Sequence, residues 1–160
     1  MKKKINIQFL IITLLAILTT VSLSIFVFYE LFKQEVMADL KTNTQLLVET
    51  DAWEQIVEKK DAGALDDGVK QLRLTLVDGT GEVILDTNAE VGSMDNHSAR
   101  PEISQALQTG EGQAIRQSST IGKNAFYYAI RLENGSVLRT AKEAGSITSV
   151  FESILPVIVI

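Results

Sequence analysis

The chain begins with a long apolar segment and then changes to a mixed pattern. Residues 9–29 hold no charged side chain, and three consecutive lysines stand at positions 2–4. A helix of this length crosses the roughly 30 Å hydrocarbon core of a bilayer. Positive charge favours the cytoplasmic side of a membrane. The pattern therefore predicts a cytoplasmic N-terminus over 1–8, a transmembrane helix over 9–29, and an extracytoplasmic position for the chain that follows.

A cleavable secretory signal is the main alternative for this segment, because it also combines a basic start with an apolar stretch. Its apolar core is usually about 7–15 residues long and lies close to a cleavage site. Here the apolar run is longer, and the one passable cleavage triplet, Val36 to Ala38, lies well beyond it. A buried core helix is a weaker alternative, because the run is apolar on all sides and flanked by lysine. The sequence favours a retained anchor.

Apolar residues at helical spacing continue after the membrane segment, and no proline or glycine occurs before Gly63. This pattern predicts a long extracytoplasmic helix over 30–62. Its apolar stripe has to be buried, either on its own domain, on a second copy of the chain, or on both. We expect a homodimer contact through three of its residues. These are Val36, Leu40 and Leu47.

From residue 73 the period of the pattern changes to two, which is typical of strands. Glycines at 79–81 and the Asn-Gly pair at 134–135 favour tight turns between neighbouring strands. Pro101 and Glu102 at the start, and Gly110 at the end, predict a short helix over 101–110. The strand candidates are 73–78, 82–87, 112–120, 124–133 and 136–143. Consecutive strands of this kind form an antiparallel sheet, and we expect the helices to cover one face of it.

The last part of the chain, 145–160, predicts an exit helix that leads into a second transmembrane helix. Its final seven residues, Ile154 to Ile160, are apolar but too few to cross a bilayer. A buried final strand is the alternative. The fold class expected is α+β. A transmembrane helix continues into a long helix, a five-stranded antiparallel sheet with a short helix follows over 63–144, and a second transmembrane helix then begins.

Charge and composition narrow the function further. The part after the membrane segment has seven lysines and five arginines against twenty acidic residues, a net charge of −8. Such an acidic domain argues against nucleic-acid binding. The chain has no cysteine, which excludes disulfides, thiol catalysis and cysteine zinc sites.

The stretch GSMDNHSARPEI holds the single histidine of the chain and joins the second strand candidate to the short helix. Asp95, Asn96 and His97 suit a loop, because their side chains bond nearby backbone groups. Pro101 fixes the start of the helix and restricts Arg100 to an extended backbone. The favoured interpretation is that Asp95 and His97 bond backbone groups and hold this loop over the sheet, with Asn96 and Pro101 shaping it.

The alternative is a ligand pocket walled by the same loop. His97 and Arg100 would then contact an anionic or polar ligand, with Arg116, Tyr127 and Tyr128 as further candidates. The two tyrosines should lie on opposite faces of one strand, so that one of them faces the pocket. No metal site is expected, since one histidine without cysteines leaves only carboxylates as ligands. No arrangement for nucleophilic catalysis is evident either.

Four short motifs resemble one known family. These are DGTGEVILD on the hairpin, MDNHSARPE in the loop, ALQTGEG after the short helix, and SSTIGKNAFYYA leading into the fourth strand. Together they cover about residues 73–132. They are similar to the extracytoplasmic PAS-like sensor domain of bacterial membrane sensor histidine kinases of the phosphate-regulon type.

The resemblance implies a sensor region that precedes a second membrane helix, a HAMP linker and a histidine kinase core, none of which is complete in these 160 residues. ATP and magnesium would then be cofactors of the kinase core and not of this chain, which would have no catalytic residue. The implied partners are membrane lipid, a second copy of the chain, an external small ligand or protein, and a response regulator acting through the kinase core. The alternatives are the input domain of a chemoreceptor or cyclic-dinucleotide enzyme, and an anchored structural or binding protein without an output domain.

Overall fold

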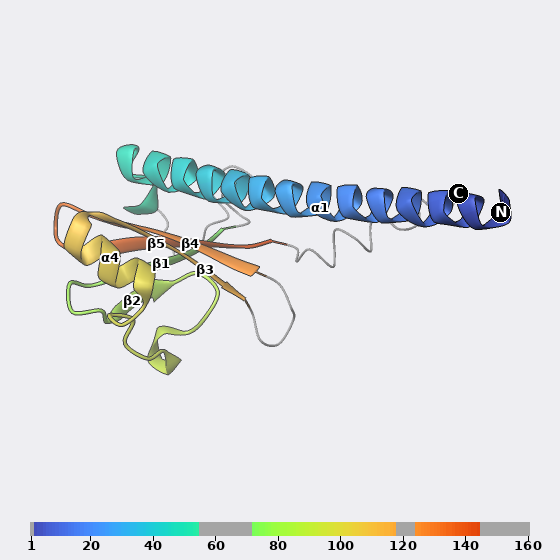
Figure 1. Ribbon diagram of the computed structural model, residues 1–160. Coiled ribbons are helices and arrows are strands. Elements are labelled where there is room, and N and C mark those ends of the chain that lie inside the picture. Colours follow the sequence, from blue (N-terminus) through green and yellow to red (C-terminus); the bar gives the residue numbers. More distant parts are fainter. Residues whose placement is uncertain (1, 55–71, 118–123, 145–160) are drawn as a thin grey trace. The chain divides into compact units, whose positions relative to one another are not determined.

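The computed structural model describes residues 2–54, 72–117 and 124–144 (Figure 1). The chain divides into two compact units, Met1–Glu35 and Val36–Ile160. The boundary falls inside the long first helix, α1 (Lys2–Glu49). The predicted exit helix over 145–160 and the predicted boundary at residue 63 lie outside the described residues.

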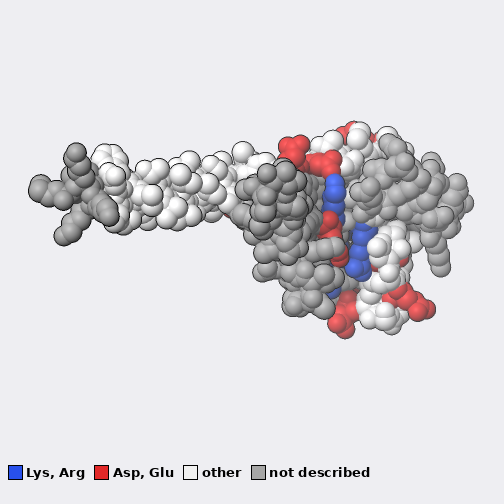
Figure 2. Space-filling view, turned by 90° about the vertical axis from the view of Figure 1, so that its right-hand side faces the viewer, with Lys and Arg blue, Asp and Glu red and all other residues white. Residues whose placement is uncertain are grey.

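The first unit consists of the N-terminal part of α1. In the described part of the chain, one helix, Asn6–Glu49, is long and apolar enough to cross a membrane, and its most apolar 18 residues have a mean hydropathy of 2.6. A membrane anchor and a signal sequence share this property. In Figure 2 the described part of this helix that grey atoms do not cover is white, and Glu30 and Lys33 near its end pair with each other at 2.7 Å. Threonine hydroxyls within it donate to the preceding turn, Thr13 to the carbonyl of Phe9 at 2.9 Å and Thr19 to that of Leu15 at 2.8 Å.

The C-terminal part of α1 belongs to the second unit and packs through one stripe. The buried residues of this stripe are Val36, Leu40, Thr44 and Leu47, spaced by three or four as a helix face requires. The helix was predicted to continue to residue 62, but α1 ends at Glu49. It ends there because Asp51 has a left-handed backbone with φ 52°. Aspartate tolerates this conformation, so the helix ends without the glycine or proline that would have announced it.

Five strands form one sheet in the order β2-β1-β5-β4-β3, and every neighbouring pair is antiparallel. The strands are β1 (Arg73–Val77), β2 (Val83–Asp86), β3 (Glu111–Gln117), β4 (Asn124–Arg131) and β5 (Val137–Ala144). A short 3-10 helix η2 (Val91–Ser93) and the helix α4 (Pro101–Thr109) lie between β2 and β3. The predicted five-stranded antiparallel sheet with one short helix is confirmed. The last strand, β5, lies at its centre.

Both faces of the sheet are covered, so the expectation of one covered face is wrong. On one face, Thr140 of β5 contacts Thr44 of α1. On the other face, Val137 and Ala129 form an apolar cluster with Ile103 and Ala106 of α4. The second covered face was not predicted because β5 is buried on both faces, with Val137 and Arg139 on one and Leu138 and Thr140 on the other. Such a strand shows no regular alternation of apolar and polar residues.

Helix α4 lies directly on the backbone of β3. A Cβ atom added to Gly112 would stand 2.0 Å from the carbonyl oxygen of Glu102 and 2.9 Å from the amide nitrogen of Ala106. Glycine therefore allows the helix and the strand to approach this closely. The approach brings the first turn of α4, which carries Glu102, over the middle of the sheet.

Candidate functional site

A group of charged and polar side chains lies on the face of the sheet that α4 covers. It comprises Arg73, Thr75, Asp86, Glu102, Arg116 and Arg139, and is called here the polar cluster. Thr75 and Glu102 are completely buried, and Arg139 is 2% exposed. Burying such charges is unfavourable unless they are paired. The contacts within the cluster therefore decide what it can do.

The first half of the polar cluster joins β1, β2 and β5. The Nε of Arg73 lies 3.0 Å from both carboxylate oxygens of Asp86, and the hydroxyl of Thr75 donates to Asp86 Oδ2 at 2.7 Å. Arg139 Nη2 donates to the hydroxyl oxygen of Thr75 at 2.8 Å. Thr75 thus links the carboxylate on β2 to the guanidinium on β5.

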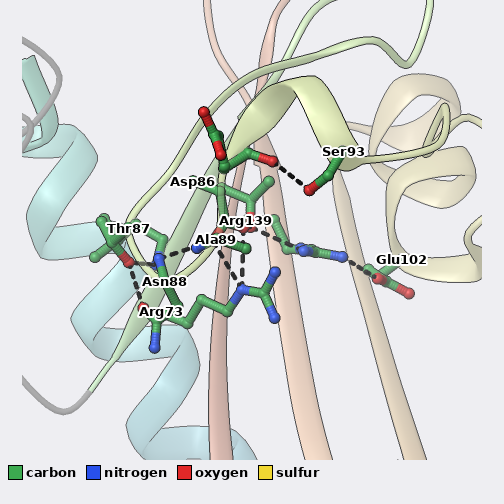
Figure 3. Close-up of polar contacts among 11 residues, drawn as sticks. Arg73, Asp86, Thr87, Asn88, Ala89, Ser93, Glu102 and Arg139 are labelled. Carbon is green, nitrogen blue, oxygen red and sulfur yellow. Dashed lines mark hydrogen bonds and ion pairs between the residues drawn. The ribbon is translucent and has the colours of Figure 1, made fainter.

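Asp86 is held as an anion by this arrangement. Burial raises the pKa of its carboxyl, but the backbone N–H of Asn88 and the side chains of Thr75 and Arg73 stabilise the charged form, so the pKa lies below its usual value. The amides of Asn88 and Ala89 donate to Asp86 Oδ1 at 2.9 and 3.0 Å. Figure 3 shows these contacts at the end of β2, with Arg139 reaching on toward Glu102.

The second half of the polar cluster joins β5 to α4 and β3. Glu102 Oε1 accepts from Arg116 Nη2 at 2.6 Å and from Arg139 Nη1 at 3.3 Å. The ring of Tyr127 lies beside both arginines, 4.0 Å from the Arg116 guanidinium carbon and 5.3 Å from that of Arg139. The Glu102 carboxylate and the Tyr127 ring therefore each contact both guanidinium groups.

The predicted residues His97 and Arg100 border this cluster. His97 is 3% exposed, and its backbone N–H donates to the carbonyl of Gly81 at 2.7 Å. Burial, and then the charges of Arg100 and Arg139, lower the pKa of the imidazole to about 4. The histidine is therefore neutral at ordinary pH. Burial and the charge of Arg116 lower the pKa of Arg100, while Glu102 acts in the opposite direction.

Four buried polar atoms of the polar cluster and His97 have no hydrogen-bond partner among the residues that the structure describes. They are His97 Nδ1, Glu102 Oε2, Arg116 Nε and Arg139 Nε. Buried polar groups in folded proteins are nearly always paired. Bound water or another polar group would satisfy these four atoms.

A separate small cavity lies at the end of β2. It has a volume of about 280 Å³ and is lined by residues of β2, the following loop and η2, among them Ile84, Asp86, Glu90 and Gly92. This size is near the lower limit for small-ligand pockets. Asp86 lines this cavity and also belongs to the polar cluster, so it connects the two.

The opposite face of β5 contacts α1 through a hydrogen bond and an ion pair. The hydroxyls of Thr44 and Thr140, both fully buried, are 2.5 Å apart. Thr44 donates its proton to the carbonyl of Leu40 at 2.6 Å, so Thr140 is the donor between the two hydroxyls. Lys142 of β5 also pairs with Asp39 of α1 at 2.9 Å. Neighbouring residues of β5 therefore contact the polar cluster on one face and α1 on the other.

The candidate tyrosines are separated as expected. Tyr127 lies on the face of the polar cluster, whereas Tyr128 lies on the face of α1, where its hydroxyl bonds Glu111. Glu111 is paired with Lys41 of α1 at 2.8 Å. The structure thus brings His97, Arg100, Arg116 and Tyr127 together and leaves Tyr128 apart. Binding of a ligand by these residues stays a prediction.

The loop residues behave differently from one another. Asn96 shapes the loop, since its side chain donates to the Thr80 carbonyl at 3.2 Å and accepts from the Ser98 amide at 2.8 Å. Pro101 begins α4 as predicted. Asp95 is exposed, and no hydrogen bond of its side chain occurs within the described residues, so its predicted bond to the backbone is wrong. For His97, the backbone and not the ring holds the loop.

The three predicted dimer residues are buried inside the single chain. Val36 is 8% exposed, Leu40 0% and Leu47 3%. They lie on the same buried stripe as Thr44, which contacts β5, and packing on its own domain was one of the alternatives left open for this stripe. A homodimer contact through this helix would need another of its faces.

Sequence reasoning missed the central members of the polar cluster. The sequence marks Glu102 only as a favourable residue at a helix N-terminus, and Arg139 as one residue of a strand. A signal was present for Arg139, because it shares its strand face with Val137 and Ala141 and so predicts a charge among apolar neighbours. Asp86 and Arg73 gave no comparable signal. Across the ranges 2–54, 72–117 and 124–144, no group of three or more His, Cys, Asp or Glu side chains is placed to hold a metal ion.

No protein-family model matches the sequence, and no curated protein sequence matches it. Among solved structures, the chain is similar to the crystal structure of the extracellular domain of the putative histidine kinase rpHK1S-Z16. The similarity has a TM-score of 0.37 at 15% sequence identity, and it covers 50% of this chain. The matched part spans 32% of that structure, about a third of its length.

Proposed function

We propose that the chain is the extracytoplasmic sensing and transmembrane signalling module of a bacterial two-component sensor histidine kinase. Residues 9–29 anchor it in the cell membrane, and the second unit lies outside. A dimeric kinase core would transfer the signal to a response regulator. This proposal rests on the motifs that resemble the phosphate-regulon type of sensor kinase and on the contacts of β5.

The observation that carries the proposal is the position of β5 between the polar cluster and α1. Arg139 bonds Thr75 and Glu102 on one face, and the next residue, Thr140, bonds Thr44 on the other. A change in the contacts of Arg139 therefore acts on the strand that holds α1. Because α1 is one continuous helix from Lys2 to Glu49, a shift at its C-terminal part is transmitted along the helix to the apolar segment.

A signal can shift this equilibrium only by as much as it prefers one arrangement of the module over the other. The polar links between α1 and the sheet are the Thr44–Thr140 and Asp39–Lys142 pairs with β5 and the Lys41–Glu111 pair with β3. Exposed ion pairs of this kind contribute about 0–1 kcal/mol each. The two ion pairs can therefore change partners at little cost, whereas the buried stripe with Leu40 and Leu47 keeps the C-terminal part of α1 on the sheet.

The membrane topology is tested with single cysteines, since the natural chain has none. Ser93→Cys is expected to react with a membrane-impermeant maleimide on intact cells, and Asn6→Cys only after the cells are made permeable. Equal protection of both positions on intact cells would refute the extracytoplasmic placement.

Signalling is tested by joining the chain to the cytoplasmic part of a histidine kinase and comparing the free and oxidised forms of the Thr44→Cys/Thr140→Cys variant. Two hydroxyls this close place the Cβ atoms within reach of a disulfide. We expect oxidation to fix autophosphorylation at one level and reduction to restore the level of the unmodified chimera. If oxidation leaves autophosphorylation unchanged, β5 and α1 do not carry the signal.

A further inference from the structure

We propose that two ion pairs between α1 and the sheet form a latch, which fixes the rotation of the C-terminal part of α1 and is released by high ionic strength in the surrounding medium. The latch consists of Asp39 with Lys142 of β5, and of Lys41 with Glu111 of β3. This inference rests on the proposed sensing function, because it adds dissolved salt as a physical signal that the module would transmit.

The two pairs of the latch lie on opposite flanks of α1. Asp39 and Lys41 are two positions apart, which corresponds to about 200° around an α-helix. Leu40, between them, is fully buried, so one charged side chain lies on each side of the buried stripe. Apolar contact has no preferred direction, so the stripe opposes separation from the sheet more than rotation of the helix about its axis. Ion pairs on both flanks oppose rotation in either sense.

The two pairs of the latch also have opposite polarity. On one flank α1 supplies the carboxylate and β5 the ammonium group, with Asp39 and Lys142 at 2.9 Å. On the other flank α1 supplies the ammonium group and β3 the carboxylate, with Lys41 and Glu111 at 2.8 Å. The exchanged combination would set like charges against each other, which is unfavourable. The charges therefore favour one rotational position of the helix.

The sheet holds its own ends of the latch in place. Glu111 Oε2 also accepts a hydrogen bond from the hydroxyl of Tyr128, which is 2% exposed. Burial, and then the bond to Glu111, raise the pKa of Tyr128, so its hydroxyl keeps the proton that it donates. Lys142 lies on the same strand face as Thr140, which contacts Thr44 of α1. When an ion pair opens, the side chain on the helix is therefore the part that moves away.

Salt can act on the latch because all four of its side chains reach solvent, with exposed fractions between 32% and 48%. The reach of a charge falls from about 30 Å at 0.01 M salt to about 3 Å at 1 M, so exposed pairs weaken as salt rises. The buried Thr44–Thr140 contact lies between the two flanks and is screened much less. High salt therefore frees the rotation of α1 while this contact and the buried stripe keep the helix on the sheet.

The test is pulsed electron paramagnetic resonance on the full chain in lipid nanodiscs at pH 7. Spin labels on Leu46→Cys of α1 and Ile115→Cys of β3 report the position of the helix, since both side chains are exposed and the natural chain has no cysteine. We expect an increase of NaCl from about 0.02 M to 0.5 M to change the ratio of latched to released molecules threefold or more. Sucrose at the same osmolality should leave the distance distribution unchanged. Equal distributions at both salt concentrations, or the same change with sucrose, would overturn the proposal.

A double variant and a matched control assign the effect to the latch. Lys41→Gln/Lys142→Gln removes both pairs and is expected to show the released distribution already at low salt, without a further response. Folding should persist because both lysines are partly exposed, and far-UV circular dichroism checks it. Lys33→Gln is the control, since Lys33 pairs with Glu30 within α1 at 2.7 Å, and it should keep the natural response. A salt response of the double variant equal to that of the natural chain would refute the latch.

Failure of the latch and failure of the proposed function give different results. The labelling of Ser93→Cys and the disulfide lock between Thr44→Cys and Thr140→Cys are carried out at one salt concentration and do not depend on the ion pairs. Distances that ignore salt, together with a kinase that responds to the disulfide, would refute the latch alone. Distances that respond to salt, together with a kinase that ignores the disulfide, would refute the proposed function and leave the latch as a property of the fold.

Discussion

Replacement of Glu102 by glutamine removes the one carboxylate that serves two arginines, while the size of the side chain stays the same. Glu102 is fully buried, and its Oε1 accepts from Arg116 at 2.6 Å and from Arg139 at 3.3 Å. The glutamine oxygen can still accept a hydrogen bond. The charge that compensates the two guanidinium groups is lost.

The expected cost follows from how far each arginine can reach water. The side chain of Arg116 is 34% exposed and can turn toward solvent, so its loss is small. The side chain of Arg139 is 2% exposed and cannot do so. Removing one partner of a buried ion pair costs about 3–5 kcal/mol. Because only Arg139 remains fully buried, we expect a loss of about 3 kcal/mol in the free energy of unfolding.

Urea unfolding of the full chain, followed by the fluorescence of the single tryptophan and by far-UV circular dichroism, measures this loss. Glu133→Gln is the control, since Glu133 is exposed and removal of its charge leaves the cluster untouched. Its effect is expected to stay within about 0.5 kcal/mol. If Glu102→Gln cost no more than Glu133→Gln, the polar cluster would not be a buried, charge-compensated unit.

Three further predictions concern other contacts. Folding lowers the pKa of His97 from 6.5 to about 4, so protonation of this residue favours the unfolded chain. The stabilisation that results is complete above pH 6.5 and is lost as the pH falls toward 4. Urea unfolding at several pH values should show a loss of up to about 3 kcal/mol in the free energy of unfolding of the natural chain, and no such loss in His97→Gln. Thr44→Val and Thr140→Val should each lower the free energy of unfolding by about 1–3 kcal/mol, because each leaves a buried polar group unpaired. In a double-mutant cycle the double variant should cost clearly less than the sum of the two. Simple additivity would show that the two hydroxyls do not interact. Gly112→Ala should lower the free energy of unfolding by about 1–3 kcal/mol, because the added Cβ meets the rigid backbone of α4. Gly92→Ala has open space around it and should be nearly neutral in the same urea unfolding. Equal effects would mean that α4 does not lie on β3 as described.

The strands and α4 could be predicted from the sequence because their signals are local. Alternation fixed the strands to within one or two residues in most cases, and Pro101 and Gly110 marked α4. The end of α1 could not be predicted, because Asp51 turns the chain without a glycine or proline. The coverage of both sheet faces was missed for a related reason: a strand buried on both faces, such as β5, carries no simple alternation of apolar and polar residues.

The candidate site was predictable only in part. His97, Arg100 and Arg116 were suspected because loops and strand ends often carry polar function, and the structure places all three together. Their partners come from β1, β2, β5 and α4, which are far apart in the sequence. Arg139 and Thr75 are 64 residues apart, and only the strand order that places β5 beside β1 brings them into contact. No spacing in the sequence encodes such a pairing.

In the proposed function, β5 couples the polar cluster to the C-terminal part of α1, so that a change in one shifts the other. Pulsed electron paramagnetic resonance between spin labels at Leu46 on α1 and Ile115 on β3, both exposed, measures this directly in nanodiscs. We expect Glu102→Gln, which changes a contact on the opposite face of the sheet, to shift or broaden this distance distribution, and Glu133→Gln to leave it unchanged. An unaltered distribution in a folded Glu102→Gln protein would contradict the coupling.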